Sequence, residues 1–145
     1  MRYETSVTID AQPAAVWAAL TDIEHWPELT ASITSVRLLQ PGKLAVGVEA
    51  QIRQPKLPPT TWRVTELEPE VSFTWIARAP GVVTTAGHVL TAEAGGGVTV
   101  LLSVEHRGPL APVVHALTGR LTRRYMGMEA AGLKSRAEAD VEAGS

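Results

Sequence analysis

The sequence contains no cysteine, few aromatic residues and no long apolar run. Without cysteine the chain has no disulfide, no thiolate nucleophile and no zinc site with sulfur ligands, which fits a reducing cytoplasm. No stretch approaches the ~18 consecutive apolar residues of a membrane-spanning helix. The opening segment MRYETSVTID alternates in polarity and lacks the apolar segment of a signal peptide. We therefore expect a cytoplasmic protein without integral membrane association.

The chain also lacks a strong charge of either sign and the common motifs of catalysis. Its formal net charge is −2, so nothing overall favours binding to nucleic acid. No GxSxG nucleophile motif occurs, and the AGGG segment is typical of a hairpin turn, not of a phosphate-binding loop. We predict no metal and no cofactor, because no i, i+4 pair or HExxH motif joins the histidines His25, His88, His106 and His115.

The pattern of polarity that is present predicts strands, then one long helix. Apolar residues make up 45% of the sequence, which suits one domain over residues 1–145, with a disordered tail at residues 140–145. Short turn segments such as QPGK and APG separate the strands and favour antiparallel neighbours. The expected strands are residues 2–10, 34–39, 46–54, 60–67, 71–79, 82–92 and 98–106. The expected helices are residues 13–21, 23–28 and 112–139.

This order of elements predicts an α+β fold with an internal hollow. About seven strands at ~4.8 Å spacing, with ~7 residues each, give the sheet one face of roughly 700 Å². A helix of about 28 residues is ~42 Å long and ~10 Å wide, so it covers only about 400 Å². The antiparallel sheet must therefore curve around the long C-terminal helix, while the two short helices after the first strand fill one end.

Three segments carry a resemblance to a known family: AQPAAVWAALTDIEHWPELTASI, TWRVTELEPEVSFTW and GHVLTAEAGGGVTVLLSVE. They resemble the START-like, or SRPBCC, superfamily, and within it the polyketide cyclase/dehydrase and lipid-transport branch. The resemblance extends from about Tyr3 to Ala137, and it departs at Leu29, where an aromatic residue is common. It implies the helix-grip fold, in which a curved antiparallel sheet wraps around a C-terminal helix and encloses a hydrophobic pocket. It does not imply one function, because members include cyclases as well as lipid and hormone binders.

Strand alternation selects candidate site residues on the sheet. It places Ala86, His88 and Leu90 on one face of a strand, so His88 faces the interior if Leu90 does. His88 is then either an acid or base for chemistry, or a histidine hydrogen-bonded within the core. Phe73 and Trp75 share a face in the same way, and Trp75 is either ordinary core or a flat wall for an aromatic guest.

Helical spacing selects further candidates on the long helix. Leu117, Leu121, Tyr125 and Met128 fall on one apolar stripe. Arg124 adjoins this stripe and either lies in solvent or reaches the pocket mouth. Glycines within the helix either allow close packing or leave room for a guest. The residues that we expect to line a ligand site are Trp26, Phe73, Trp75, Ala86, His88, Leu102, Leu117, Leu121, Arg124, Tyr125 and Met128.

Three functions are compatible with these features. The first is binding of a small hydrophobic or aromatic molecule, such as a lipid or polyketide, in a pocket between the sheet and the C-terminal helix. The second is a cyclase/dehydrase-like enzyme in which His88 moves a proton and Tyr125 or Arg124 stabilises enolate charge. The third is a protein-interaction module whose pocket is closed by its own side chains. The oligomeric state is left open.

Overall fold

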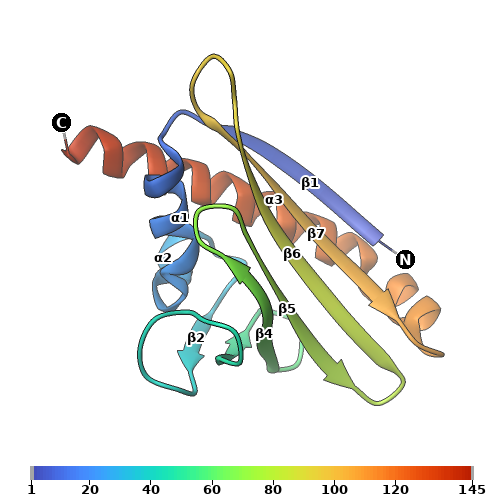
Figure 1. Cartoon of the computed structure of the whole chain (residues 1–145). Coiled ribbons are helices and arrows are strands. Elements are labelled where there is room, and N and C mark those ends of the chain that lie inside the picture. Colours follow the sequence, from blue (N-terminus) through green and yellow to red (C-terminus); the bar gives the residue numbers. More distant parts are fainter. Residues whose placement is uncertain (1, 145) are drawn as a thin grey trace.

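A seven-stranded antiparallel sheet curves around one long helix in the computed structural model, which describes residues 2–144 (Figure 1). The helices are α1 (Pro13–Thr21), the short 3₁₀ helix η1 (Ile23–His25), α2 (Trp26–Leu29) and α3 (Ala111–Gly144). The strands are β1 (Arg2–Ile9), β2 (Ser35–Leu38), β3 (Glu49–Arg53), β4 (Thr60–Glu68), β5 (Ser72–Ala79), β6 (Val82–Ala92) and β7 (Val98–Arg107). The predicted helix-grip fold is confirmed.

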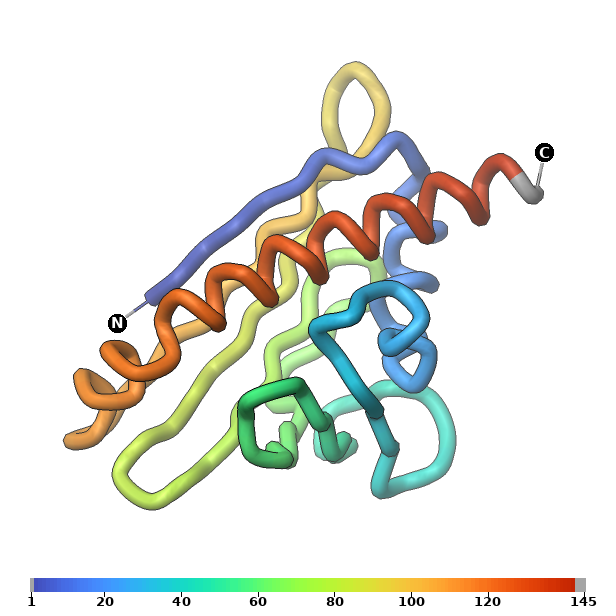
Figure 2. The backbone as a smooth tube through the Cα atoms, turned by 180° about the vertical axis from the view of Figure 1, so that it is seen from behind, coloured from blue at the N-terminus to red at the C-terminus, as the bar shows by residue number. Residues whose placement is uncertain are grey.

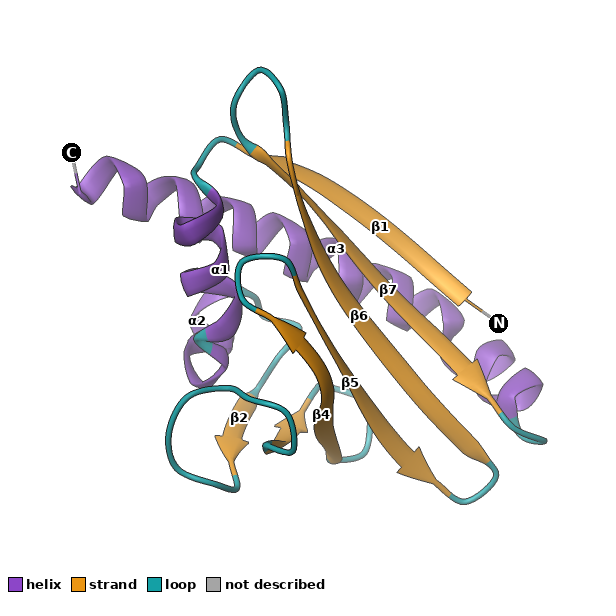
Figure 3. Cartoon of the chain, in the orientation of Figure 1, coloured by secondary structure: helices purple, strands orange, loops and turns teal. Residues whose placement is uncertain are grey.

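The strand order explains why the short helices lie at one end of the molecule. The order across the sheet is β1-β7-β6-β5-β4-β3-β2, so β1 and β2 form opposite edges. The chain between them must cross the whole sheet, and it does so through α1, η1 and α2. Figure 2 shows α3 running alongside β1, and Figure 3 shows α1 and α2 grouped beside the C-terminal half of α3.

The inner face of the sheet follows the predicted alternation. On β5 the side chains of Phe73, Trp75 and Ala77 are buried, while β6 buries Ala86 and His88. A register shift between Val64 and Glu66 interrupts the pairing of β4 with β5. Such irregularities bend a strand and increase its twist, which suits a sheet that wraps around a helix.

The core is densely packed beneath α1 and α2 and along the C-terminal half of α3. Side chains with almost no exposure gather there, among them Ile9, Val16, Ile23, Phe73 and Val98. Gly132 allows the close approach of α2 to α3, because a Cβ atom at this position would overlap with the carbonyl group of Leu29. This packing fixes one end of the molecule and leaves the space under the N-terminal half of α3 for the cavity described below.

The long helix differs from its predicted bounds at both ends. It begins at Ala111, one residue before the predicted start, and continues through Gly144, across most of the segment predicted to be a disordered tail. Two i, i+4 ion pairs extend it: Lys134 with Glu138, and Arg136 with Asp140, where the Nε–Oδ2 distance is 3.2 Å. Such pairs stabilise a helix modestly, and the fully buried side chain of Ala137 also packs this part of α3 against the core. Ser145 lies outside the described residues.

Candidate functional site

A cavity of about 690 Å³ lies between the sheet and α3. This volume is in the range of small-molecule sites. Its wall combines side chains from the inner faces of β4 to β7, the segment between β3 and β4, and the α3 residues Val114, Thr118, Thr122, Tyr125, Met126 and Glu129. The cavity is therefore not filled by Trp26, Trp75 and Tyr125, and the predicted alternative of a closed pocket is wrong.

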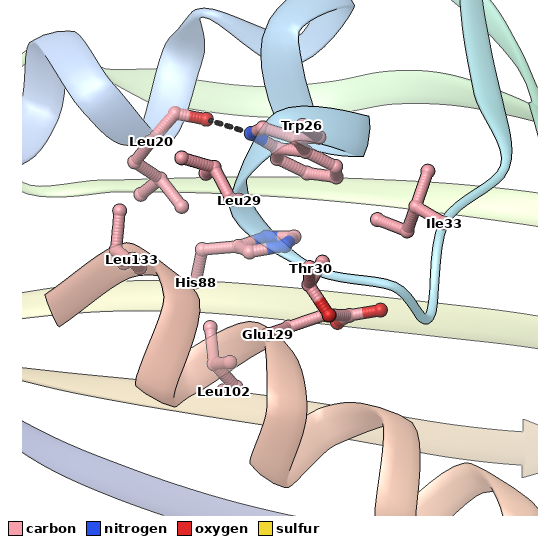
Figure 4. A pocket seen from close by; sticks show the side chains of 9 residues that line it. All are labelled: Leu20, Trp26, Leu29, Thr30, Ile33, His88, Leu102, Glu129 and Leu133. Atoms are coloured by element: carbon pink, nitrogen blue, oxygen red, sulfur yellow. Dashed lines mark hydrogen bonds between the residues drawn. The ribbon is translucent and has the colours of Figure 1, made fainter. Parts of the chain in front are cut away.

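A smaller pocket of about 30 Å³ continues this space beneath α2. Trp26, Ile33, His88, Leu102 and Glu129 line both spaces, so the small pocket is the inner end of the cavity. Figure 4 shows side chains from α2, β6 and α3 directed into it. Its volume accommodates about one water molecule, so any larger guest must occupy the main cavity and reach inward.

Three tryptophans form an aromatic wall. The ring centroids of Trp26 and Trp75 lie 5.4 Å apart at 70°, and those of Trp62 and Trp75 lie 5.7 Å apart at 29°. The indole N–H of Trp26 donates to the carbonyl oxygen of Leu20 at 3.0 Å, which fixes the ring at the base of α2. These flat faces provide a large apolar contact area with little loss of conformational entropy on binding.

His88 presents a hydrogen-bond acceptor to the cavity. Its ring stacks on Phe73 with centroids 4.0 Å apart, and its Nδ1–H donates to the carbonyl oxygen of Phe73 at 3.1 Å. Because Nδ1 carries the proton, Nε2 of the neutral ring is an acceptor. Burial lowers the pKa of His88 to about 4, so the ring is neutral at pH 7. A neutral ring with a low pKa is a weak base at pH 7, and the catalytic role of His88 stays a prediction.

Glu129 is the titratable group that the sequence analysis overlooked. Its carboxyl group lines both the cavity and its inner end, and burial raises its pKa to about 7. The Nε2 atom of Gln54 donates to its Oε1 at 3.3 Å, a long hydrogen bond. The spacing of Glu129 by four residues from Tyr125 and from Leu133 places it on their face of the helix and could have revealed it.

The segment between β3 and β4 is tied to α3 beside the cavity. The hydroxyl of Tyr125 donates to the carbonyl oxygen of Pro55 at 2.5 Å, and Gln54 reaches Glu129. Residues of this segment, including Leu57 and Pro58, line the cavity. These two contacts hold the segment across the space between the sheet and the helix.

Of the predicted site residues, the structure brings six into the cavity wall and leaves five outside it. Those in the wall are Trp26, Trp75, Ala86, His88, Leu102 and Tyr125. Phe73 is fully buried behind His88 and does not line the cavity.

The predictions for the other four residues require correction, because α3 presents a different face to the cavity. Leu117 is 79% exposed, Arg124 is exposed, and Leu121 and Met128 are half-buried outside the cavity. The inner face instead carries Thr118, Thr122 and Glu129 among apolar residues. Apolar spacing identifies the face of a helix that packs in a dry core, and this face borders a hollow that tolerates polar groups.

Two kinds of site are not found in residues 2–144. No three His, Asp or Glu side chains there are arranged to hold a metal ion. No helix in that range is both long and apolar enough to cross a membrane.

Comparison with known proteins identifies a family for the chain. The model of the family described as polyketide cyclase / dehydrase and lipid transport matches residues 1–138. No curated protein matches the sequence. Among solved structures, the Zhui aromatase/cyclase from Streptomyces sp. R1128 has a TM-score of 0.79 and 16% identity over 97% of this chain and 95% of its own.

Two further structures show the same fold. Ara h 8.0201 has a TM-score of 0.67 and 15% identity over 93% of this chain and 98% of its own. The di-domain ARO/CYC BexL from the BE-7585A biosynthetic pathway has a TM-score of 0.73 and 18% identity, over 95% of this chain and 46% of its own. At these identities the likeness shows a shared fold and does not transfer an activity.

Proposed function

Because the chain belongs to the polyketide cyclase/dehydrase and lipid transport family, we propose that it binds a small, largely apolar molecule with a flat or aromatic part. The observation that carries this proposal is the cavity of about 690 Å³ with tryptophans in its wall. A few polar groups, chiefly His88 and Glu129, lie at its inner end and would orient the guest. Residues 1–145 then act as a single ligand-binding domain.

A ligand panel tests the proposal directly. We expect at least one flat apolar compound from a panel of polyketides, quinones, flavonoids and fatty alcohols to bind and to raise the unfolding temperature. At a free concentration of 100 times its Kd, such a ligand adds about 2.7 kcal/mol to the free energy of unfolding. The absence of any shift across the panel, with no small molecule found by native mass spectrometry of the purified protein, would contradict the proposal.

A cavity-blocking variant locates the binding. Thr118 faces the cavity, whereas Ala116 is exposed on the same helix. We expect Thr118→Trp to weaken binding at least tenfold, because the indole occupies the space of the guest, while Ala116→Trp leaves affinity unchanged. Isothermal titration calorimetry measures both. Equal affinities in the two variants would place the ligand elsewhere.

Acid–base catalysis on a poly-ketone is the second candidate function. The observation that favours it is that Glu129, with a pKa raised to about 7, and the bare Nε2 of neutral His88 line one space. In an intramolecular aldol step, His88 would take the proton from the carbon between two carbonyls, and Glu129 would protonate the carbonyl oxygen that becomes a hydroxyl as the carbon–carbon bond forms.

Product analysis with a linear poly-ketone tests this candidate. We expect Glu129→Gln to lower the rate of ring formation about 100-fold, within the usual range for one acid or base. His88→Gln should have a smaller effect, because a group with a pKa of about 4 is a weak base at pH 7. A rate unchanged in Glu129→Gln would exclude the proposed acid.

A further inference from the structure

The inner end of the cavity offers hydrogen-bond acceptors and no cation. Glu129 has no ion pair within residues 2–144, and its hydrogen bond there is the long one from Gln54. The Nδ1–H of His88 donates to the carbonyl oxygen of Phe73, so the ring presents its other nitrogen, Nε2, to the cavity as an acceptor. Figure 4 shows the ring of His88 beside Trp26 and the carboxyl group of Glu129 beside Thr30. A carboxyl oxygen, an imidazole nitrogen and an aromatic π-face all attract a positively charged donor.

The other charged and titratable groups in the cavity wall do not supply this cation. Tyr125 donates its hydroxyl to Pro55. Arg78 is exposed. It lies on β5, roughly 16 Å along the strand from Phe73, which is the residue that pairs with His88. His106 is at the same far end, paired in register with Thr84, and burial lowers its pKa, which favours the neutral ring. The electrostatic complement of Glu129 is therefore absent from the wall.

Glu129 is half-buried, and a carboxyl group withdrawn from water without a counter-charge is costly, whereas a glutamine would fill the same space without that cost. Desolvation is the cause of the raised pKa of Glu129, which shows that no neighbouring positive charge offsets it. Burying an ionised group is tolerated in proteins chiefly where a partner of opposite charge accompanies it. A ligand can be that partner.

We infer, resting on the proposed function, that the guest carries a protonated primary or secondary amine. The ammonium group lies at the inner end of the cavity, where it donates hydrogen bonds to the carboxylate of Glu129 and to Nε2 of His88. The face of Trp26 or Trp75 contacts the cation, and the apolar remainder of the guest occupies the main cavity. Carboxylate ligands such as fatty acids are disfavoured, since two carboxylates would share one apolar space.

Three compounds with one ring system and different head groups test the inference: naphthylmethylamine, naphthylmethanol and naphthoic acid. At pH 8 we expect the amine to bind at least tenfold more tightly than the alcohol, and the acid to bind most weakly. The affinity of the amine should fall about tenfold between pH 8 and pH 6, because it requires ionised Glu129, whose pKa in the free protein is about 7. His88 stays neutral in this range.

Variants and proton counting separate the inference from the proposed function. Glu129→Gln should abolish the preference for the amine over the alcohol, while Glu28→Gln, at an exposed position, should preserve it. Near pH 6, calorimetry in buffers of different ionisation enthalpy should show the release of close to one proton when the amine binds.

If the alcohol binds as tightly as the amine and is blocked by Thr118→Trp, the inference fails and the proposed function stands. If the amine binds more tightly at pH 6 than at pH 8, its binding does not require ionised Glu129 and the inference is overturned. If none of the three binds, the inference fails, and the ligand panel described above decides the proposed function separately.

Discussion

Replacing Gly132 with alanine is expected to lower the free energy of unfolding by about 2 kcal/mol. A Cβ atom at this position would lie 2.9 Å from the carbonyl carbon of Leu29 and would overlap with its oxygen. These are backbone atoms of α2, which cannot rotate away as a side chain can. Overpacking of this kind costs about 3 kcal/mol, and the better helix propensity of alanine returns up to about 1 kcal/mol. Thermal or urea unfolding followed by circular dichroism measures the loss.

The same helix supplies a matched control for this variant. No heavy atom would lie within 4 Å of a Cβ atom on Gly127, so Gly127→Ala should raise stability by up to about 1 kcal/mol. The two alanine variants should therefore differ by about 3 kcal/mol, although both make the same chemical change in α3. Equal stabilities would show that α2 moves away from α3 without cost, and the close packing of the two helices would then not be needed for the fold.

These glycines illustrate what helix composition can and cannot reveal. The sequence offered two interpretations for each, close packing or room for a guest, and the structure shows close packing at two of the three. Gly119 and Gly132 are packed, with the hydroxyl of Tyr3 lying 2.5 Å from a Cβ atom placed on Gly119. Gly127 is open. The difference depends on which distant segment lies opposite each turn, and local sequence does not contain that information.

The strands were predictable because the sheet presents one face to the interior. Alternation placed Phe73, Trp75 and His88 inward, and each is buried. The area estimate also anticipated a hollow, since one helix is narrower than the curved sheet. This success needed only the two-residue period of a strand and the dimensions of regular elements.

The face of α3 was not predictable by the same reasoning. Leu117 was placed inside because it continues an apolar stripe, yet it is among the most exposed apolar side chains. Thr122 and Glu129 line the cavity although they are polar. Hydrophobic spacing fails where a helix borders a space for a guest, and the hydrogen bond from Tyr125 to Pro55 joins segments that no local pattern connects.

Glu129 and His88 are expected to contribute opposite pH dependences to stability. Burial raises the pKa of Glu129 from 4.5 to about 7, so its contribution is most favourable below pH 4.5 and is lost as the pH rises through 7. Burial lowers the pKa of His88 from 6.5 to about 4, so its contribution is full above pH 6.5 and is lost as the pH falls through 4. Each of these two pH-dependent contributions to the free energy of unfolding amounts to about 3 kcal/mol. Between pH 4.5 and 6.5 the two nearly cancel in the native protein.

Single substitutions should expose each contribution. Relative to the native protein, Glu129→Gln should gain about 3 kcal/mol at pH 8 and nothing from this source at pH 4.5, because the carboxyl group is neutral there. His88→Phe should carry a constant penalty for the lost hydrogen bond to Phe73, and that penalty should shrink by about 3 kcal/mol between pH 7 and pH 4. Urea unfolding at several pH values measures both differences, and subtracting the native curve removes the titration of all other groups.

The control for this comparison is Glu28→Gln, which makes the same chemical change at an exposed side chain outside the cavity. If the Glu129→Gln difference is independent of pH, the carboxyl group ionises as readily in the cavity as in water. The inner end of the cavity would then be hydrated and would not hold a buried acid, and both catalysis by Glu129 and its need for a cationic guest would lose their physical basis. A steep difference of the predicted sign would instead show that the cavity keeps water away from Glu129, as both require.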